Sequence, residues 1–482
     1  MSQSINNKFN EKTLVIDLDK TLLKIDLFKE ALLRSLLLNP FYFFNSISRL
    51  LKSKASAKHY LAKKISLDIS NLPYNSRVIE LINSYKKDGY KIILATGATE
   101  KVANDISSYL GIFDKTIASS KNFNNVGPNK LKSLKKIIFD NFIYVGDSKE
   151  DLPIWLHCKY AIIAGNKKSL QKSLESNGVK IIRVIKNKSH FMKNIIKELR
   201  VHQWVKNLIL FIPIFTSHTF LESGFLINTI KSFISFSLLA SSIYLFNDII
   251  DLNHDRKHPK NKKRPIASGE IDILLAYIVF ISLLLIGFYI AYGLGFNFFS
   301  LVLAYILLNL FYSFWLKKII ILDVILLMSF YTLRLIGGHL PNGIPLSPWL
   351  LSFTIFLFFS LGLLKRYVDT ITMQKNDEKI LAGRGYTVND KNILMALGSG
   401  SGLISALVLI LYTGSQQVQT LYNSPMILVG LAPILLFWIS RLWLIASRGF
   451  INSDPVLFAI KDFTTYLVVF CFFVILVLSK FS

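Results

Sequence analysis

The feature that most constrains this chain is a series of nine apolar segments in its C-terminal half. They lie near 206–222, 229–249, 273–292, 297–316, 320–338, 348–365, 393–412, 426–445 and 462–479. Because the hydrocarbon core of a bilayer is about 30 Å thick, a helix of about 20 apolar residues crosses it. The segments predict an all-α polytopic membrane domain of nine transmembrane helices over 191–482. The polar, lysine-rich residues 1–190 predict a separate domain.

The charge pattern agrees with a membrane and argues against a nucleic-acid partner. The formal net charge is +26, but the basic residues flank long apolar runs. Loops 250–272, 317–319, 366–392 and 446–461 are basic, whereas connections 293–296, 339–347 and 413–425 hold no Lys or Arg. By the positive-inside bias we expect an inner-membrane protein whose basic loops and N-terminal domain are cytoplasmic. Cys158 and Cys471 lie in different halves, so no disulfide framework is expected.

Three aspartates follow the second apolar segment at helical spacing. Asp248, Asp251 and Asp255 are three and then four residues apart, which predicts that they share one face of a helix end. A basic loop containing Lys260 and Arg264 follows directly. Carboxylates bind hard cations, and Lys and Arg bind phosphate oxygens, so the pattern predicts a site for a diphosphate and Mg²⁺. Helix capping alone explains the cluster poorly.

The same stretch resembles the UbiA superfamily of intramembrane prenyltransferases, which have nine helices and an NDxxDxxxD motif that 247–255 matches. Further features resemble its polyprenyl-phosphate phosphoribosyltransferase branch: 200–207, HPKxxxRPxAxG at 258–269, Tyr312 to Lys317, Asp323, Arg334, Lys365 with Arg366, and Asp454. Members that prenylate aromatic rings carry a second aspartate motif. This chain has Lys365, Arg366 and Asp369 there instead.

The resemblance implies transfer of 5-phosphoribose from phosphoribosyl diphosphate to a polyprenyl phosphate. Mg²⁺ would join Asp248, Asp251 and Asp255 to the donor diphosphate, and the metal with Lys260 or Arg264 would stabilise the leaving group. The lipid phosphate is already anionic and needs no general base. Expected substrate contacts are Lys206, Asn247, Lys260, Arg264, Tyr312, Lys317, Arg334, Lys365 and Arg366.

Three other functions stay open at this point. The first is prenyl transfer to an aromatic acceptor, which the missing second aspartate motif disfavours. The second is a membrane-anchored phosphatase whose helices only bind lipid, which the intact aspartate motif disfavours. The third is transport, disfavoured because the charged residues gather at one face. The sequence leaves the lipid chain length and the oligomeric state unknown.

Four short motifs follow strand-like segments within about 11–190. They contain Asp17 and Asp19, Thr96 and Gly97, Lys130, and Asp147 and Asp151. Alternating strands and helices predict a Rossmann-like parallel sheet with the motifs at its C-terminal edge.

In this order the motifs resemble those of the haloacid dehalogenase (HAD) superfamily. The resemblance implies that Asp17 is the nucleophile and Asp19 the general acid and base. Thr96, Gly97 and Lys130 would hold the transferring phosphate. Asp147 and Asp151 would hold Mg²⁺ with the acids of the first motif, Asp17 and Asp19. The second acid of the first motif favours a phosphatase over a dehalogenase, and a purely structural domain is disfavoured because every chemical position is filled.

About 70 residues between the first two motifs predict a small helical cap near 23–90. Its segment 32–51 either packs within the cap or lies in the membrane interface as an amphipathic element. Residues 180–198 join the two domains, and such tethering raises the concentration of one domain's product at the other. The implied transferase product keeps a 5-phosphate, which a HAD phosphatase would remove.

Overall fold

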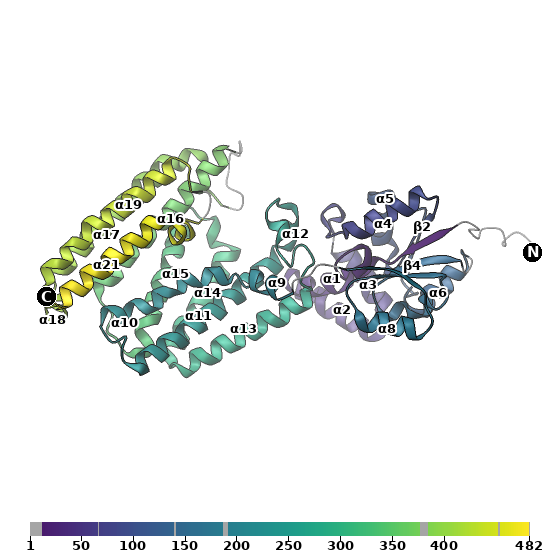
Figure 1. The fold of residues 1–482 in the computed structure, drawn as a ribbon, viewed down its shortest axis with the longest axis horizontal. Coiled ribbons are helices and arrows are strands. Elements are labelled where there is room, and N and C mark those ends of the chain that lie inside the picture. Colours follow the sequence, from purple (N-terminus) through teal and green to yellow (C-terminus); the bar gives the residue numbers. More distant parts are fainter. Residues whose placement is uncertain are drawn as a thin grey trace, which may run out of the picture. The chain divides into compact units, whose positions relative to one another are not determined.

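In the computed structural model, residues 12–65, 67–138, 141–186, 191–375, 384–451 and 454–481 are described. The chain divides into two compact units (Figure 1). The first contains 1–199 together with 244–280, and the second contains 200–243 together with 281–482. The segment that carries the membrane aspartate motif therefore clusters with the N-terminal residues.

The first unit is built on a six-stranded parallel sheet in the order β3-β2-β1-β4-β5-β6. The strands are β1 Thr13–Ile16, β2 Lys91–Thr99, β3 Lys115–Ser119, β4 Phe142–Gly146, β5 Tyr160–Ala164 and β6 Ile181–Ile185. Central strands β1 and β4 are short buried apolar runs, as expected where helices cover both faces of a parallel sheet. The strand order reverses between β1 and β4, which is where α/β sheets bind ligands.

Helices cover both faces of this sheet (Figure 1). Helices α4 Ser76–Lys87 and α5 Glu100–Leu110 pack on one face through an apolar cluster that includes Leu14, Ile82 and Ile106. Helices α6 Pro128–Lys135, α7 Leu152–Trp155 and α8 Lys168–Ser176 pack on the other face. The expected Rossmann-like α/β fold with a parallel sheet is confirmed.

Three helices form the cap between the first two motifs: α1 Leu27–Leu38, α2 Pro40–Lys52 and α3 Lys54–Lys64. Side chains of Asp26, Asn39 and Ser53 accept hydrogen bonds at their N-termini. Helix α4 belongs to the sheet core, so the cap helices occupy a narrower range than 23–90. Short α9 Phe191–Glu198 precedes the membrane half.

The membrane half contains eight helices long and apolar enough to cross a bilayer, counted among the described residues. They include α11 Ser223–Ile250, α13 Ile273–Gly293, α14 Phe296–Phe314, α15 Leu322–His339, α16 Pro348–Lys375, α17 Lys391–Thr413, α19 Leu431–Ser447 and α21 Phe463–Phe481. Shorter helices are α10 Ile212–Thr216, α12 Leu252–Lys257, α18 Gln416–Leu421 and α20 Pro455–Lys461. The chain is thus a multi-pass membrane protein with an all-α second half.

The ninth expected span, 206–222, is not among these eight helices. Residues Val201–Phe211 form a 3₁₀ helix that continues only into the short α10. Pro213 lacks a backbone N–H at the junction, and the helix ends at Thr216. This broken segment lies very close to α15, because a methyl group added at Gly338 would clash with the carbonyl oxygen of Leu210. Glycine is needed there for close helix approach.

Candidate functional site

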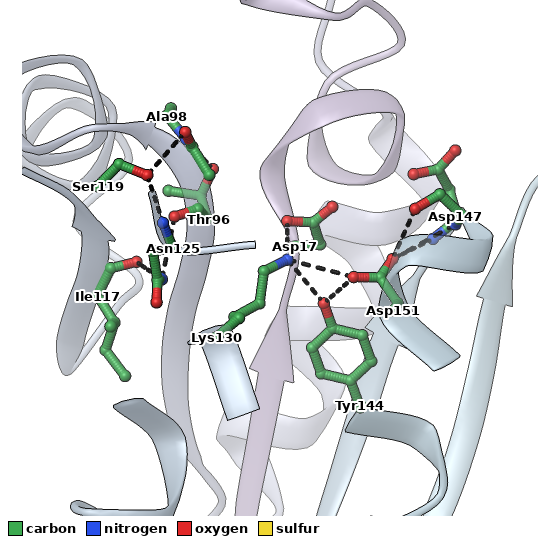
Figure 2. Close-up of polar contacts among 12 residues, drawn as sticks. Asp17, Thr96, Ala98, Ile117, Ser119, Asn125, Lys130, Tyr144, Asp147 and Asp151 are labelled. Carbon is green, nitrogen blue, oxygen red and sulfur yellow. Dashed lines mark hydrogen bonds and ion pairs between the residues drawn. The ribbon is translucent and has the colours of Figure 1, made fainter. Parts of the chain in front are cut away.

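Three buried aspartates meet at the edge of the parallel sheet (Figure 2). Asp17 follows β1, and Asp147 and Asp151 follow β4. One carboxylate oxygen from each lies within 4.8 Å of the others. Neighbouring parallel strands end side by side, so this topology joins acids that are 134 residues apart in sequence (Asp17 to Asp151).

Lys130 lies between two of these acids (Figure 2). Its Nζ donates to Oδ1 of Asp17 at 2.8 Å and to Oδ1 of Asp151 at 3.2 Å. The Tyr144 hydroxyl accepts from Lys130 at 3.0 Å and donates to Asp151 at 2.7 Å. Burial alone would lower the pKa of Lys130, but Asp151 and Asp17 outweigh it and raise that pKa. Lys130 is therefore held as an ammonium at the site.

The second oxygen of Asp151 and the carboxylate of Asp147 have their own partners. Oδ2 of Asp151 accepts from the backbone N–H groups of Asp147 and Ser148, each at 3.3 Å. Oδ2 of Asp147 accepts from Nζ of Lys167 at 2.6 Å. These bonds fix the direction of both carboxylates.

Asp19 lies where the cap begins. Its Oδ1 accepts from the backbone N–H of Leu27, the first residue of α1, at 2.9 Å. Desolvation, followed by the nearby Asp26, raises the pKa of Asp19 to about 6. A carboxyl group with a pKa near neutrality can both donate and accept a proton. This arrangement suits the general acid and base that the sequence predicts there.

The Thr96 and Gly97 motif is held by a buried hydrogen-bond network on the other side of Lys130 (Figure 2). Thr96 Oγ1 accepts from the N–H of Ala98 at 3.0 Å, and Asn125 Nδ2 donates to the Thr96 carbonyl at 3.1 Å. Strand β2 continues past Thr96 to Thr99, with a register irregularity between Ala95 and Thr99. The sequence suggested that this strand ends at Thr96, but in the structure it continues beyond that residue.

Three residues of this site were missed from the sequence: Lys58, Tyr144 and Lys167. Lys58 reaches from cap helix α3 and donates to the Gly97 carbonyl at 2.5 Å. In sequence it is one lysine among several in a polar helix. Tyr144 reads as an ordinary strand residue, and Lys167 follows a strand with no motif around it. No motif around these three residues identifies them as part of the site, because the groups that they contact come from other helices and strands.

The three-aspartate cluster fits Mg²⁺. Its donors are carboxylate oxygens, which are the ligands that this ion prefers. Three such residues leave coordination positions for water and phosphate oxygens. Lys130 adds a positive charge beside the cluster through its hydrogen bonds to Asp17 and Asp151. The carboxylate of Asp19 does not belong to this cluster, and its role as a metal ligand stays a prediction.

The membrane aspartate motif is interrupted rather than continuous. Helix α11 ends at Ile250, Asp251 lies at the cap position, and α12 starts at Leu252. Asp248 and Asp255 are buried, whereas Asp251 is exposed. Backbone N–H groups of Asp251 and Asp255 nevertheless donate to the carbonyls of Asn247 and Asp251, each at 2.8 Å, so the shared face of the three aspartates stays a prediction.

Arg264 joins the two buried aspartates of this motif. Its Nη1 donates to Oδ1 of Asp248 at 2.8 Å and to Oδ2 of Asp255 at 2.5 Å. Asn261 also donates to Asp255, at 2.8 Å. Two carboxylates aimed at one cationic group form a hard-oxygen donor set of the kind that holds Mg²⁺. Asn247 is half-buried beside them and Lys260 is exposed.

In the second unit, Asp454 forms ion pairs with two lysines that the sequence singled out. Its Oδ2 lies 2.6 Å from Nζ of Lys206 and 3.8 Å from Nζ of Lys365. All three side chains are partly exposed, and the Lys365 side chain is 33% exposed. Such paired cations are suited to a phosphate group.

Arg366 and Arg334 are engaged inside the protein. Arg366 is fully buried and donates to Asp323 at 2.6 Å and to Asp369 at 2.7 Å, with Tyr312 at 3.5 Å. Arg334 donates to Asn207 at 2.6 Å and to the Tyr305 hydroxyl at 2.8 Å. The expected direct phosphate contacts of both arginines are not matched, because their donors serve helix packing. Lys317 is half-buried.

This chain is similar to several known proteins. Residues 210–453 match the model of the UbiA prenyltransferase family. The chain is 34% identical over 457 residues to the uncharacterized protein y4nM of Sinorhizobium fredii (strain NBRC 101917 / NGR234), covering 94% of this chain and 88% of that protein. It is 34% identical over 197 residues to the decaprenyl-phosphate phosphoribosyltransferase of Mycolicibacterium smegmatis, covering 40% of this chain and 61% of that protein. A solved HAD family hydrolase from Salmonella enterica subsp. enterica serovar Typhi is similar with TM-score 0.27 and 15% identity, covering 36% of this chain and 68% of that chain.

Proposed function

Because the chain belongs to the UbiA prenyltransferase family, we propose that its membrane half transfers 5-phosphoribose from phosphoribosyl diphosphate to a polyprenyl phosphate. The observation that carries this choice of substrates is the 34% identity to decaprenyl-phosphate phosphoribosyltransferases. The stretch 365–369, which lacks the second aspartate motif of members that prenylate aromatic rings, supports it. We place the reaction at the cytoplasmic face of the inner membrane, where the basic loops lie by the positive-inside bias.

In the proposed transfer, an oxygen of the lipid phosphate attacks C1 of the ribose, and the bond from C1 to the diphosphate breaks. No proton moves, because the nucleophile is already an anion. Mg²⁺ at the membrane aspartates would neutralise charge on the departing diphosphate. Arg264 would release Asp248 and Asp255 and turn to the diphosphate oxygens, while Asp251 would add a ligand. Lys206 and Lys365 would hold the lipid phosphate.

We propose further that the N-terminal domain is a phosphatase that removes the 5-phosphate from the ribosyl lipid. The buried group of Asp17, Asp147 and Asp151 with Lys130 carries this assignment. Asp17 attacks phosphorus, the bond from phosphorus to the ribose oxygen breaks, and Asp19 protonates that oxygen. Asp19 then removes a proton from a water molecule whose oxygen attacks phosphorus, and the bond from phosphorus to the Asp17 oxygen breaks, which releases phosphate and restores Asp17. Mg²⁺ would shield the phosphate oxygens from the attacking carboxylate.

The two activities can be separated with purified full-length protein in detergent, Mg²⁺, labelled phosphoribosyl diphosphate and a polyprenyl phosphate. We expect wild type to form a ribosyl lipid without the 5-phosphate. Asp248→Ala should form no labelled lipid, and Asp17→Asn should accumulate the lipid that retains its 5-phosphate. Transfer only from a prenyl diphosphate would overturn the transferase proposal. Full dephosphorylation by Asp17→Asn would overturn the phosphatase proposal.

A further inference from the structure

A cavity of about 220 Å³ in the first unit is lined by both phosphatase residues and a loop from the membrane half. The phosphatase contributes Asp147 and Lys167, and also Lys20, which directly follows the catalytic pair of acids. The membrane half contributes residues 266 and 269–273, which follow the aspartate motif and lead into α13. This stretch of chain is therefore one wall of a space that opens beside the phosphatase metal ligands.

The loop is attached firmly to the cap. Arg256 donates through both terminal nitrogens to the Glu30 carboxylate of α1, at 2.7 and 2.8 Å, and through Nε to the Ala267 carbonyl at 3.1 Å. Both charged side chains are almost completely buried, with exposures of 4% and 2%. A buried two-pronged ion pair of this kind defines one geometry. It fixes the loop to the cap helix that covers the phosphatase site.

Backbone contacts also bring the loop close to the cap entrance. Gly269 has φ of +71°, and a methyl group there would lie 2.9 Å from Cβ of Lys24. The Tyr277 hydroxyl donates to the carbonyl of Leu33 in α1 at 3.0 Å. The chain therefore lies against the cap at Gly269 in the loop and again at Tyr277 in α13.

An ion pair crosses the cavity between the two halves of the sequence. Nζ of Lys20 lies 2.8 Å from Oδ2 of Asp272, and the two side chains are 37% and 34% exposed. Lys20 has a left-handed backbone, with φ of +55°, which a lysine adopts only when surrounding structure requires it. Oδ1 of Asp272 accepts from the N–H of Leu274 at 2.9 Å. Both groups are thus held in place while remaining accessible.

The charges around the cavity are mixed. Its lining includes the lysines Lys20, Lys24, Lys29 and Lys167 and the acids Asp26, Glu30, Asp147, Glu270 and Asp272. A simple anion pocket would carry an excess of cations. Alternating ammonium and carboxylate groups instead supply both donors and acceptors, which is what a ring with several hydroxyl groups requires. The volume is that of about seven waters at about 30 Å³ each, enough for one small sugar but not for a polyprenyl chain.

We propose that Lys20 and Asp272 bind the sugar hydroxyls of the phosphatase substrate, so that the membrane-half loop determines phosphatase specificity. The substrate class is a pentose 5-phosphate whose anomeric substituent extends out of the cavity. This inference rests on the proposed phosphatase function. It adds that a residue far along the chain, in the transferase half, selects what the phosphatase cleaves.

The test compares two substrates with full-length protein in detergent and Mg²⁺. One is methyl ribofuranoside 5-phosphate, which carries the sugar with a blocked C1, and the other is p-nitrophenyl phosphate, which lacks it. For Asp272→Asn and Lys20→Met we expect the ratio of kcat/KM for the sugar phosphate over the aryl phosphate to fall at least tenfold, mainly through a higher KM for the sugar. The exposed Asp88→Asn is the matched control and should change this ratio less than twofold.

The outcomes separate the two proposals. If wild type cleaves both substrates and neither variant changes the ratio, the sugar-binding assignment is wrong while the phosphatase proposal stands. A parallel loss of both activities also leaves the ratio unchanged and has the same meaning. If wild type cleaves the aryl phosphate but not the sugar phosphate, or cleaves neither, the proposed phosphatase function itself fails. Melting temperatures of all variants identify those that lose the fold.

Discussion

The two aspartate clusters of this chain are built in opposite ways. Asp17, Asp147 and Asp151 are distant in sequence and meet because neighbouring parallel strands end at one edge. Asp248 and Asp255 are close in sequence, yet the helix that should align them is interrupted at Asp251. The first cluster is therefore a property of the sheet, whereas the second depends on a helix break and on the loop that returns Arg264.

The clusters also differ in how their charge is balanced. Lys130 is 4% exposed at its side chain, whereas Arg264 is 31% exposed. Removing a buried cation from between carboxylates lowers folding stability strongly, because water cannot take its place. Removing a partly exposed cation lowers folding stability little, because water can solvate the carboxylates. The comparison leads to four predictions, from the largest expected effect to the smallest.

Lys130→Met should cause the largest loss. The phosphatase kcat should fall on the order of 10³-fold, because the ammonium that stabilises the transferring phosphate is removed. The buried Asp17 and Asp151 would also lose their cation, which costs about 3–5 kcal/mol of folding stability. Phosphate release and thermal unfolding measure the two effects. A variant that retains near wild-type phosphatase activity would contradict the site described above.

The metal requirement should separate the clusters. Asp147→Asn should raise the Mg²⁺ concentration for half-maximal phosphatase activity at least tenfold and leave that of the transferase unchanged, because one hard ligand is weakened. Asp255→Asn should do the reverse. Titration of Mg²⁺ after chelator treatment measures both activities in each variant. A shift in both activities from either substitution would mean that the clusters share a metal.

Glu30→Gln should weaken the attachment of the loop to the cap. Arg256 would remain buried without its carboxylate, at a cost of about 3 kcal/mol. We expect a lower unfolding temperature and faster protease cleavage in 258–272. Lys29→Met is the neighbouring control, since that side chain is 49% exposed. Equal stability of the two variants would show that the buried ion pair contributes little.

Arg264→Gln should have the smallest effect on stability. Its side chain is partly exposed and water can replace it, so we expect a loss below about 1 kcal/mol in thermal unfolding. The KM for phosphoribosyl diphosphate should nevertheless rise, because one cation for the diphosphate is lost. A large drop in stability with unchanged KM would make Arg264 a structural residue.

The sequence by itself determined the architecture of both halves. Short apolar strands alternating with helices specified the parallel sheet, and the order of the motifs placed Asp17, Thr96, Lys130 and Asp147 at its edge. Long apolar runs specified eight of the nine expected spans. Such features are read locally, because hydrophobic periodicity and length depend on neighbouring residues alone.

Tertiary structure decided what local patterns do not contain. It ended α11 before Asp251, buried Arg366 on Asp323 instead of leaving it for phosphate, and brought Lys58 and Tyr144 to the phosphatase site. It also grouped 244–280 with the N-terminal unit through Arg256 and Glu30. Each of these outcomes depends on which distant group a charged side chain meets, since a buried charge must find a partner and the chain's topology supplies it.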